Sequence, residues 1–327
     1  MTRYHLSLLF IGQAVESIYM TNQGTRFFLP IILIIAILAI STASIFIRFA
    51  QAGGAPSIVI AAIRLTIASL ILAPIAWIRH RPELRTLTRP DLLLGIIAGF
   101  FLAVHFATWI SSLAYTSVAN SVVLVSTSPL WVAILSPLFL NERLTRVAII
   151  GLVLAFVGGT IIGLSDACSI QNGLHCPELS HALQGNAMWG NILAVCGALA
   201  VSGYLLIGRM VRAKMSLIPY IFLVYGISAI FLLVFMFAAK QTPFGYSTQT
   251  YGWIFLLAVI PQLIGHSTFN WLLKYLSATL VAVTTLSEPI GSAMLAYIIL
   301  KESPSLAVLM GGALILIGIY LTSKQNK

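Results

Sequence analysis

The sequence predicts an all-α integral membrane protein whose ten transmembrane helices form two inverted five-helix repeats. Three observations predict this fold. Of the 327 residues, 59% are hydrophobic and only 8% are charged, whereas about a quarter of an ordinary soluble domain is charged. Apolar runs of transmembrane length follow one another along the chain, and the second half repeats the pattern of the first. This composition excludes a water-soluble globule, a disordered chain and a fibrous protein.

The apolar runs are about 19 to 24 residues long, and about 20 residues suffice to cross a bilayer as a helix. Small clusters of Pro, Gly, Ser and charged residues separate them. The predicted spans are residues 28–50, 57–78, 91–114, 118–140, 145–163, 188–209, 216–238, 250–273, 277–300 and 304–322. The apolar part of the segment before the first span is too short for a signal sequence, so we expect a loose or interfacial tail.

The two halves of the chain repeat at an offset of 160 residues, because residues 113–163 align without a gap on residues 273–323. The matches that apolar composition does not explain are Pro129 with Pro289, Glu142 with Glu302, Gly151 with Gly311, and Gly158 with Gly318. Each copy holds five spans, so the second copy enters the membrane from the opposite side. Inverted repeats are typical of secondary transporters, which bind their substrate near the midplane where the halves meet.

The chain therefore divides into five predicted regions. They are an N-terminal cytoplasmic tail at 1–27, a first repeat at 28–163, an external linker at 164–187, a second repeat at 188–323 and a cytoplasmic tail at 324–327.

The net charge of +10 reflects orientation in the membrane. With a cytoplasmic N-terminus, 14 of the 18 Lys and Arg residues fall on the inner side, and only Lys240 and Lys301 fall on the outer side. This distribution follows the positive-inside rule. We therefore expect a multi-pass protein of the cytoplasmic (inner) membrane, with both termini cytoplasmic and the bilayer, rather than a nucleic acid, as its surroundings.

Residues 128–144 run from SPL to NERL and precede a Gly-rich helix, and their repeat at 287–303 runs from SEPI to KES. These segments resemble the EamA family, the ten-helix branch of the drug/metabolite transporter superfamily, and the resemblance covers about residues 30–322. It implies export or exchange of small metabolites, amino acids or drug-like compounds by alternating access. It also implies that helices five and ten lie behind the eight helices around the central cavity. It identifies no particular substrate.

Glu288 is the only one of the eight acidic residues that falls near the middle of a predicted span. A charge at a helix centre costs about 2.5 to 3.5 kcal/mol, so such a residue usually faces a cavity and has a partner. Pro289 removes a backbone donor beside it and loosens the helix, and Pro129 occupies the equivalent place in the first repeat. We expect Glu288 to bind a substrate ammonium group or to exchange a proton. The alternative is a protonated Glu288 that bonds helices together.

Other polar side chains fall in the middle of spans. His105 and His266 lie in the third and eighth spans, although the ungapped repeat places Gly265 opposite His105. Arg64 lies about two turns into the second span, where it would pair with Glu288 or hold a substrate carboxylate. For both histidines the alternative is an interhelical hydrogen bond without contact to a ligand.

Further cavity candidates follow from helical spacing. Trp109 is one turn after His105, and Asn270 is one turn after His266, so each pair shares a helix face. Tyr204 in the sixth span and Asn120 in the fourth complete the predicted set. For the aromatic residues, packing is the alternative.

Other features are predicted to be structural. Glu142 and Glu302 stand at span ends, where a helix N-terminus favours an acid, and paired glycines indicate close helix packing. Cys196 lies in an apolar run and is expected to pack as a small hydrophobe. Cys168 and Cys176 share the linker and would form a disulfide only in an oxidising compartment. No metal site or cofactor is predicted.

The leading functional prediction is a secondary transporter for a small molecule, with protons as the candidate coupling ion, working as a monomer or a homodimer. A channel or a lipid-flipping protein shares the same fold signals and stays open as the alternative. A membrane enzyme fits less well, because no Ser/His/Asp set gathers at one level of the membrane. The chain also has no phosphate-binding Gly-rich loop with a Walker lysine, so ATP is not expected to drive it.

Overall fold

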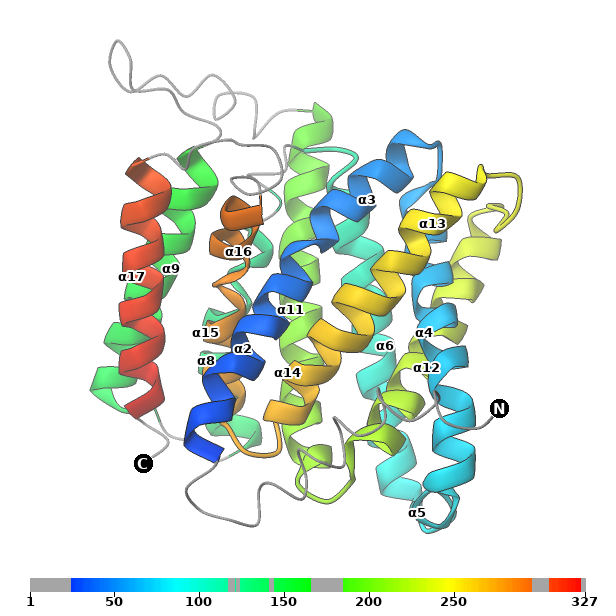
Figure 1. Ribbon diagram of the computed structural model, residues 1–327, viewed down its shortest axis with the longest axis horizontal. Coiled ribbons are helices and arrows are strands. Elements are labelled where there is room, and N and C mark those ends of the chain that lie inside the picture. The colour runs from blue at the N-terminus through cyan, green and yellow to red at the C-terminus, as the bar shows by residue number, and fades with distance from the viewer. Residues whose placement is uncertain are drawn as a thin grey trace, which may run out of the picture.

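The computed structural model describes residues 25–116, 121, 124–140, 144–165, 185–295 and 306–324. Every element of this part of the chain is a helix, and the helices lie side by side in one bundle (Figure 1). The all-α prediction is thus confirmed for these residues. In the first half the helices are α2 (Thr25–Ser41), α3 (Ala43–Ala52), α4 (Ser57–Arg79), α5 (Arg81–Arg85), α6 (Arg89–Ser112), α8 (Ser128–Phe139) and α9 (Arg146–Ser165).

The second half is built in the same way. Its helices are α11 (Gly185–Arg212), α12 (Leu217–Ala238), α13 (Thr248–Leu257), the π-helix η1 (Ala258–His266), α14 (Ser267–Leu272), α15 (Ala278–Thr285), α16 (Glu288–Leu295) and α17 (Leu306–Ser323).

The length and apolar character of the helices fit a membrane protein. Among the described residues, six helical stretches are long and apolar enough to cross a bilayer. These are Ile31–Ala52, Ser57–Arg79, Arg89–Ser112, Asn186–Arg212, Leu217–Ala238 and Thr248–Leu272. Shorter apolar helices lie at Ser128–Phe139, Arg146–Ile161 and Leu309–Thr322. Large hydrophobic side chains on the outside of the bundle, such as Ile78 at 78% and Leu138 at 75% exposure, suit contact with lipid.

Four of the predicted spans are not regular helices. The fourth turns at Ser126 and Thr127, directly before α8. The first is interrupted at Thr42, between α2 and α3, and the ninth at Leu286 and Ser287, between α15 and α16. The eighth passes through η1, which contains Pro261. Proline lacks the N–H that a helix needs and clashes with the preceding turn, so interruptions before Pro289 and around Pro261 have a local cause.

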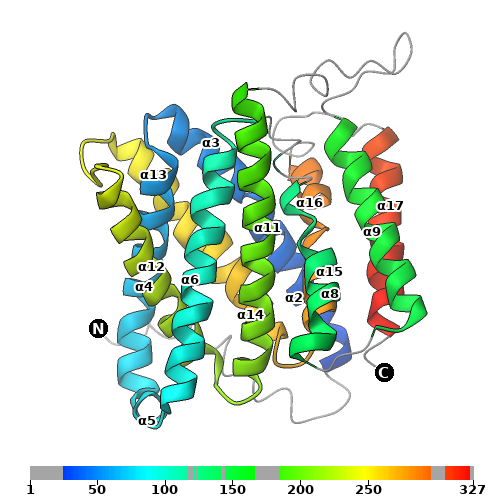
Figure 2. The same cartoon turned by 180° about the vertical axis from the view of Figure 1, so that it is seen from behind.

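Several contacts between helices have a counterpart in which the two halves are exchanged. Corresponding helices of the two halves pack on each other: α4 on α12 and α9 on α17. The packing of α6 on α11 has its counterpart in α2 on η1 and α3 on α13, and that of α8 on α11 in α16 on α2. The pair α9 and α17 stands at one end of the bundle, which the rear view makes plain (Figure 2).

Glycines let α9 and α17 approach each other closely. A Cβ at Gly158 would lie 2.4 Å from the Gly311 carbonyl oxygen, and a Cβ at Gly318 would lie 2.4 Å from the Gly151 carbonyl oxygen. Gly311 is the repeat partner of Gly151, and Gly318 is that of Gly158, so the two contacts are related by the repeat. Gly311 and Gly318 belong to the glycines from which close packing was predicted, whereas Gly159, also in that prediction, meets only Leu286 Cδ2 at 3.9 Å.

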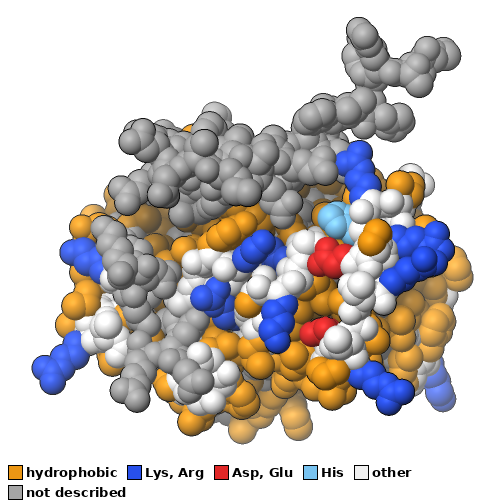
Figure 3. All heavy atoms as spheres, turned by 90° about the horizontal axis from the view of Figure 1, so that it is seen from below, with side chains coloured by type: hydrophobic (Ala, Val, Ile, Leu, Met, Phe, Trp, Pro, Cys, Tyr) orange, Lys and Arg blue, Asp and Glu red, His pale blue; other side chains and the backbone are white. Residues whose placement is uncertain are grey.

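Basic side chains gather on one face of the bundle. This face, here called the α5 face, contains α5 and the ends of α4, α11, α14 and α17 (Figure 3). Lys240 lies at the other end of α12, on the opposite face. The basic residues of the described chain at the α5 face are Arg79, Arg81, Arg85, Arg89, Arg146, Arg209, Arg212, Lys214, Lys274 and Lys324.

Candidate functional site

Arg64 is a fully buried cation within α4. Its guanidinium carbon lies 4.1 Å from the centre of the Phe106 ring on α6, a distance at which the ring face attracts a cation. Within the described part of the chain, its three guanidinium nitrogens have no hydrogen-bond partner. A buried charge without such partners is costly. The guanidinium donors of Arg64 are therefore available to a bound polar group.

An aromatic cluster surrounds Arg64. Phe106 contacts Arg64 with its face and His266 edge to face, with ring centroids 5.5 Å apart. His105 stacks on Trp109 with ring centroids 5.8 Å apart and an angle of 9° between the planes. The stack fixes the Trp109 ring, whose Nε1 is buried and has no hydrogen-bond partner in the described residues. The cluster joins α4 and α6 of the first half to η1 of the second half.

His105 and His266 have different surroundings. His105 Nδ1 lies 2.9 Å from the carbonyl oxygen of Gly197 on α11, so this histidine ties two helices together. At the equivalent place in the second half, Gly265 packs against Ile40 of α2. His266, one residue further on, is half-buried and points to Phe106. The two histidines are therefore close together without being equivalent by the repeat.

Glu288 stands at the first turn of α16, directly after the interruption of the ninth span. It is half-buried, and it lies within electrostatic range of Arg64. No ion pair of 4 Å or less joins the two side chains, in the part of the chain that the structure describes. The Glu288 carbonyl accepts a hydrogen bond of 2.9 Å from Ser41 Oγ on α2. The acid and the guanidinium thus come from different halves and interact electrostatically, without an ion pair among the described residues.

Asn270 lies at the centre of a buried hydrogen-bond network. Its Oδ1 accepts from Tyr204 OH at 2.5 Å, and its Nδ2 donates to Tyr225 OH at 3.2 Å and to the His266 carbonyl at 2.9 Å. Tyr225 OH also lies 3.2 Å from Ser267 Oγ. Tyr225 is within electrostatic range of Arg64, so the network continues toward the buried cation.

Seven of the predicted residues thus belong to one polar region in the middle of the bundle. They are Arg64, His105, Trp109, Tyr204, His266, Asn270 and Glu288. Pro129 is buried near the start of α8, and Pro289 follows Glu288 in α16. Asn120, Cys168 and Cys176 lie outside the described residues, as do Glu142 and Glu302. Cys196 is exposed on the apolar surface of α11, so its predicted burial was wrong.

Three side chains in or beside this region were absent from the predicted set: Phe106, Tyr225, and Gln262, which lies beside Tyr225. Gln262 is a fully buried amide inside an apolar run, so the mid-span criterion that selected Glu288 would have found it. Tyr225 stands beside the repeat counterpart of Arg64, which was a usable signal. Phe106 gave no signal, because a phenylalanine in a span looks like any other packing residue.

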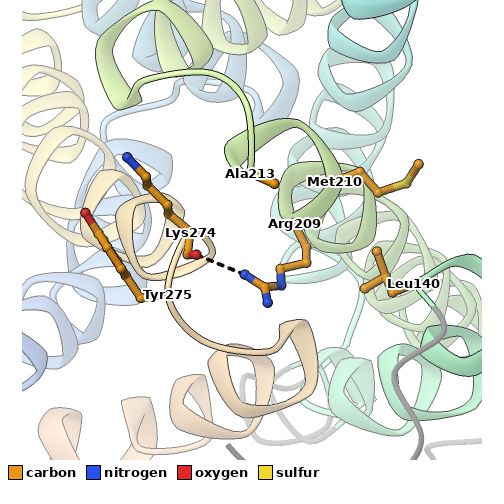
Figure 4. A pocket seen from close by; sticks show the side chains of 6 residues that line it. All are labelled: Leu140, Arg209, Met210, Ala213, Lys274 and Tyr275. Atoms are coloured by element: carbon orange, nitrogen blue, oxygen red, sulfur yellow. Dashed lines mark hydrogen bonds between the residues drawn. The ribbon is translucent and has the colours of Figure 1, made fainter.

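A cavity of about 540 Å³ opens on the α5 face, at a different level from the central residues. It is lined by Leu140, Arg209, Met210, Ala213, Lys274 and Tyr275 (Figure 4). Arg209 Nη1 donates to the carbonyl oxygens of Leu273 at 2.8 Å and Lys274 at 3.1 Å, so its head group crosses from α11 to the end of α14 (Figure 4). The guanidinium is therefore engaged in holding helices together at this mouth.

Residues 28–164 and residues 188–324 each match the EamA-like transporter family, and the second match lies 160 residues after the first. The chain belongs to this family. The resemblance found in the sequence is thereby confirmed, and the chain is a multi-pass membrane protein of a transporter family.

The chain is also similar to individual transporters and to a solved structure. An uncharacterized transporter of Archaeoglobus fulgidus is 25% identical, over 82% of this chain and 89% of the relative. The pseudopaline exporter CntI of Pseudomonas aeruginosa is 21% identical, over 74% of this chain and 78% of the relative. One solved structure, described only as a crystal structure of a protein, has a TM-score of 0.70 at 18% identity, covering 90% of this chain and 96% of that chain. The last likeness concerns the fold alone.

Proposed function

We propose that this chain is a secondary active transporter that exports or exchanges a small molecule across the cytoplasmic membrane by alternating access. Its binding site is the polar region between the halves, with Arg64 from the first half and Glu288 from the second. The observation that carries the proposal is the buried Arg64 guanidinium, which lies over Phe106 without a hydrogen-bond partner in the described residues while Glu288 acts on it from across the bundle.

The paired helix contacts support an arrangement of ten spans in two inverted repeats. In a two-fold arrangement of antiparallel halves, each contact has a counterpart with the halves exchanged. The contacts of α4 with α12 and of α9 with α17 follow this rule, and the facing glycines follow it residue by residue. Rocking of one half against the other would then expose a central site first to one side and then to the other.

The chemistry of the site favours a ligand with an anionic group. Such a ligand would either carry a cationic group of its own or be transported together with a proton. Arg64 offers several donors in one plane, which suits a carboxylate. Glu288 would hold a cationic group of the ligand or exchange a proton during the cycle. His105, His266, Trp109, Asn270, Tyr204 and Asn120 would orient the ligand, and Pro129 and Pro289 would belong to the moving parts.

Orientation and direction follow from the charges and the relatives. The α5 face carries most of the described basic residues, so we assign it to the cytoplasm, together with both termini. The name of CntI as an exporter supports outward transport.

The proposal is tested in bacteria that express the chain and are challenged with a panel of toxic amino acids, amino-acid analogues and drugs. We expect resistance to at least one compound with the wild type, and its loss with Glu288→Gln. Asp91→Asn is the matched control, because this acid caps α6 at the α5 face, away from the centre. Equal resistance of wild type and Glu288→Gln at every pH, with both proteins folded, would contradict the assignment of the site.

The wild type and these variants also distinguish a carrier from the alternatives in liposomes. A carrier gives saturable uptake that depends on a gradient. Continuous ion conductance would instead favour a channel, and movement of labelled lipid between leaflets would favour a lipid-flipping protein.

A further inference from the structure

At each end of the bundle a polar side chain forms hydrogen bonds between spans. The two side chains hold corresponding places in the two halves but differ in chemistry. Ser41 of α2 donates to the Glu288 carbonyl, and Ser202 of α11 donates to the Ser128 carbonyl at 3.0 Å. Because Ser128 is the repeat counterpart of Glu288, Ser41 and Ser202 make equivalent contacts, although they are 161 residues apart and the offset of 160 pairs Ser41 with Val201. Ten residues after Ser41 comes Gln51, and ten residues after Ser202 comes Arg212.

Gln51 and Arg212 make equivalent contacts at opposite faces. Gln51 Nε2 lies 3.4 Å from the Ile110 carbonyl oxygen, and Arg212 Nε lies 3.0 Å from the Asn270 carbonyl oxygen. Ile110 and Asn270 are 160 residues apart, which is the repeat offset, whereas Gln51 and Arg212 are 161 apart. Each side chain therefore ties the end of the first span of its half to a carbonyl in the third span of the same half, and the two carbonyls are repeat counterparts.

The second bond of each side chain also reaches the start of the next span, although the acceptors differ. Gln51 Nε2 donates to Ser57 Oγ at 3.1 Å, at the start of α4. Arg212 Nη1 donates to the Met215 carbonyl, just before the start of α12. Both side chains thus hold three consecutive parts of their half together. Gln51 does so at the end of the bundle that we assign to the outside, and Arg212 at the end that we assign to the cytoplasm.

The strength of the two ties differs. Arg212 is 1% exposed and carries a charge, whereas Gln51 is neutral and half-buried. Arg209 adds bonds to the Leu273 and Lys274 carbonyls, while its equivalent in α3, Arg48, is exposed and has no such bond in the described residues. Hydrogen bonds with a charged donor are roughly twice as strong as neutral ones. The cytoplasmic end is therefore tied more strongly than the outer end.

The cytoplasmic tie also reaches the central site. Arg212 binds the backbone of Asn270, and the side chain of Asn270 binds Tyr204 and Tyr225. A movement that releases Arg212 therefore displaces a residue whose side chain lies in the polar region. The outer tie ends on Ile110, whose apolar side chain offers no equivalent link.

We propose that Arg212 and Gln51 are paired closing residues, and that their unequal strength makes the site face the outside at rest. This inference rests on the proposed transport function and on its orientation in the membrane. The outer tie breaks more readily, so the state open to the outside is the more populated one. Arg212 is a positioning residue that acts through Asn270, and it does not touch the substrate.

The test measures from which side the centre can be reached. A reporter cysteine replaces Ser287, whose Oγ is buried without a hydrogen-bond partner in the described residues, in a chain whose native cysteines are changed to Ser. The rate of its modification by a charged methanethiosulfonate is measured in right-side-out and inside-out vesicles. The wild type is expected to react faster from the outside.

Exchange of the closing residues should reverse this preference. Arg212→Gln weakens the cytoplasmic tie and Gln51→Arg strengthens the outer one, and each should raise the inside-to-outside ratio of rates about five- to tenfold. The double exchange should reverse the preferred side. Arg85→Gln is the matched control, because it removes an exposed positive charge from the same face as Arg212 and should leave the ratio unchanged.

An unchanged ratio in Gln51→Arg and in folded Arg212→Gln would overturn the inference. If Arg212→Gln does not fold, Gln51→Arg alone decides, because Gln51 is only half-buried. Such a failure would leave the proposed transport function standing, provided that the wild type still gives saturable uptake without ion conductance. Conductance in the wild type would instead contradict the transport function itself.

Discussion

The crossing of α9 and α17 gives a prediction that the structure makes quantitative. An alanine at Gly158 would place its Cβ 2.4 Å from the Gly311 carbonyl oxygen and 3.0 Å from the Ile315 backbone nitrogen. Both atoms belong to the backbone, so the helices must move apart. An alanine at Gly159, the next residue, would meet only Leu286 Cδ2 at 3.9 Å, which is ordinary contact.

Both substitutions gain the same intrinsic helix propensity, about 1 kcal/mol. Overpacking in a tight contact costs about 1 to 3 kcal/mol. We therefore expect the unfolding free energy of Gly158→Ala to be about 1 to 3 kcal/mol lower than that of Gly159→Ala. The assay is reversible unfolding of the purified chain in mixed micelles.

The second half offers the same comparison. Gly318→Ala would place its Cβ 2.4 Å from the Gly151 carbonyl oxygen, whereas Gly312→Ala would come no closer than 3.6 Å to Ile290. Gly158 and Gly318 are repeat counterparts with the same 2.4 Å contact, so Gly318→Ala should likewise have an unfolding free energy about 1 to 3 kcal/mol lower than Gly312→Ala. A Gly158→Ala protein as stable as Gly159→Ala would refute the reasoning about this crossing.

Three further predictions concern single side chains. Trp109→Phe keeps an aromatic ring that stacks on His105 but removes the buried N–H, so we expect an unchanged melting temperature and a KM for transport raised about tenfold. The control is Trp253→Phe, because the Trp253 ring stacks on Phe46 at 5.9 Å. Equal KM values for the two variants would count against a role of Trp109 in binding. Glu83→Gln weakens the two bonds that the Glu83 carboxylate accepts from the backbone N–H and hydroxyl of Ser216 at the start of α12, so stability should fall by about 1 kcal/mol in thermal unfolding, while Arg85→Gln should leave it unchanged. Ser41→Ala and Ser202→Ala should each lower the unfolding free energy by about 1 kcal/mol, because the Ser41 hydroxyl donates to the Glu288 carbonyl and the Ser202 hydroxyl to the Ser128 carbonyl. Clearly different losses of stability would speak against the equivalence of these two sites.

The sequence was sufficient for the main outline of the fold, because bilayer thickness and backbone satisfaction leave few choices to a chain this apolar. The helix interruptions at Thr42 and in η1 were not predicted. Hydropathy does not distinguish an α-helix from a π-helix, and Pro261 alone does not say how the chain accommodates it. The interruption before Pro289 was anticipated, because proline disfavours helical geometry in the residue before it.

The candidate site was partly predictable for a related reason. Charged and polar residues in the middle of a span are costly, so Arg64, Glu288 and the histidines stood out from their neighbours. The partners of these residues depend on how helices rotate against each other, which a single sequence does not record. Phe106 under Arg64 and the carbonyl of Gly197 beside His105 are examples.

The most direct test of the proposed transporter is counterflow in liposomes, with a compound that the resistance panel identifies. Liposomes are loaded with the unlabelled compound, and entry of the labelled compound is followed for the wild type, Glu288→Gln, Arg64→Gln and the control Asp91→Asn. The account predicts transient accumulation of label with the wild type and the control, and at least a tenfold lower rate with both central variants. Equal accumulation with folded Glu288→Gln and Arg64→Gln would contradict a site between these two residues.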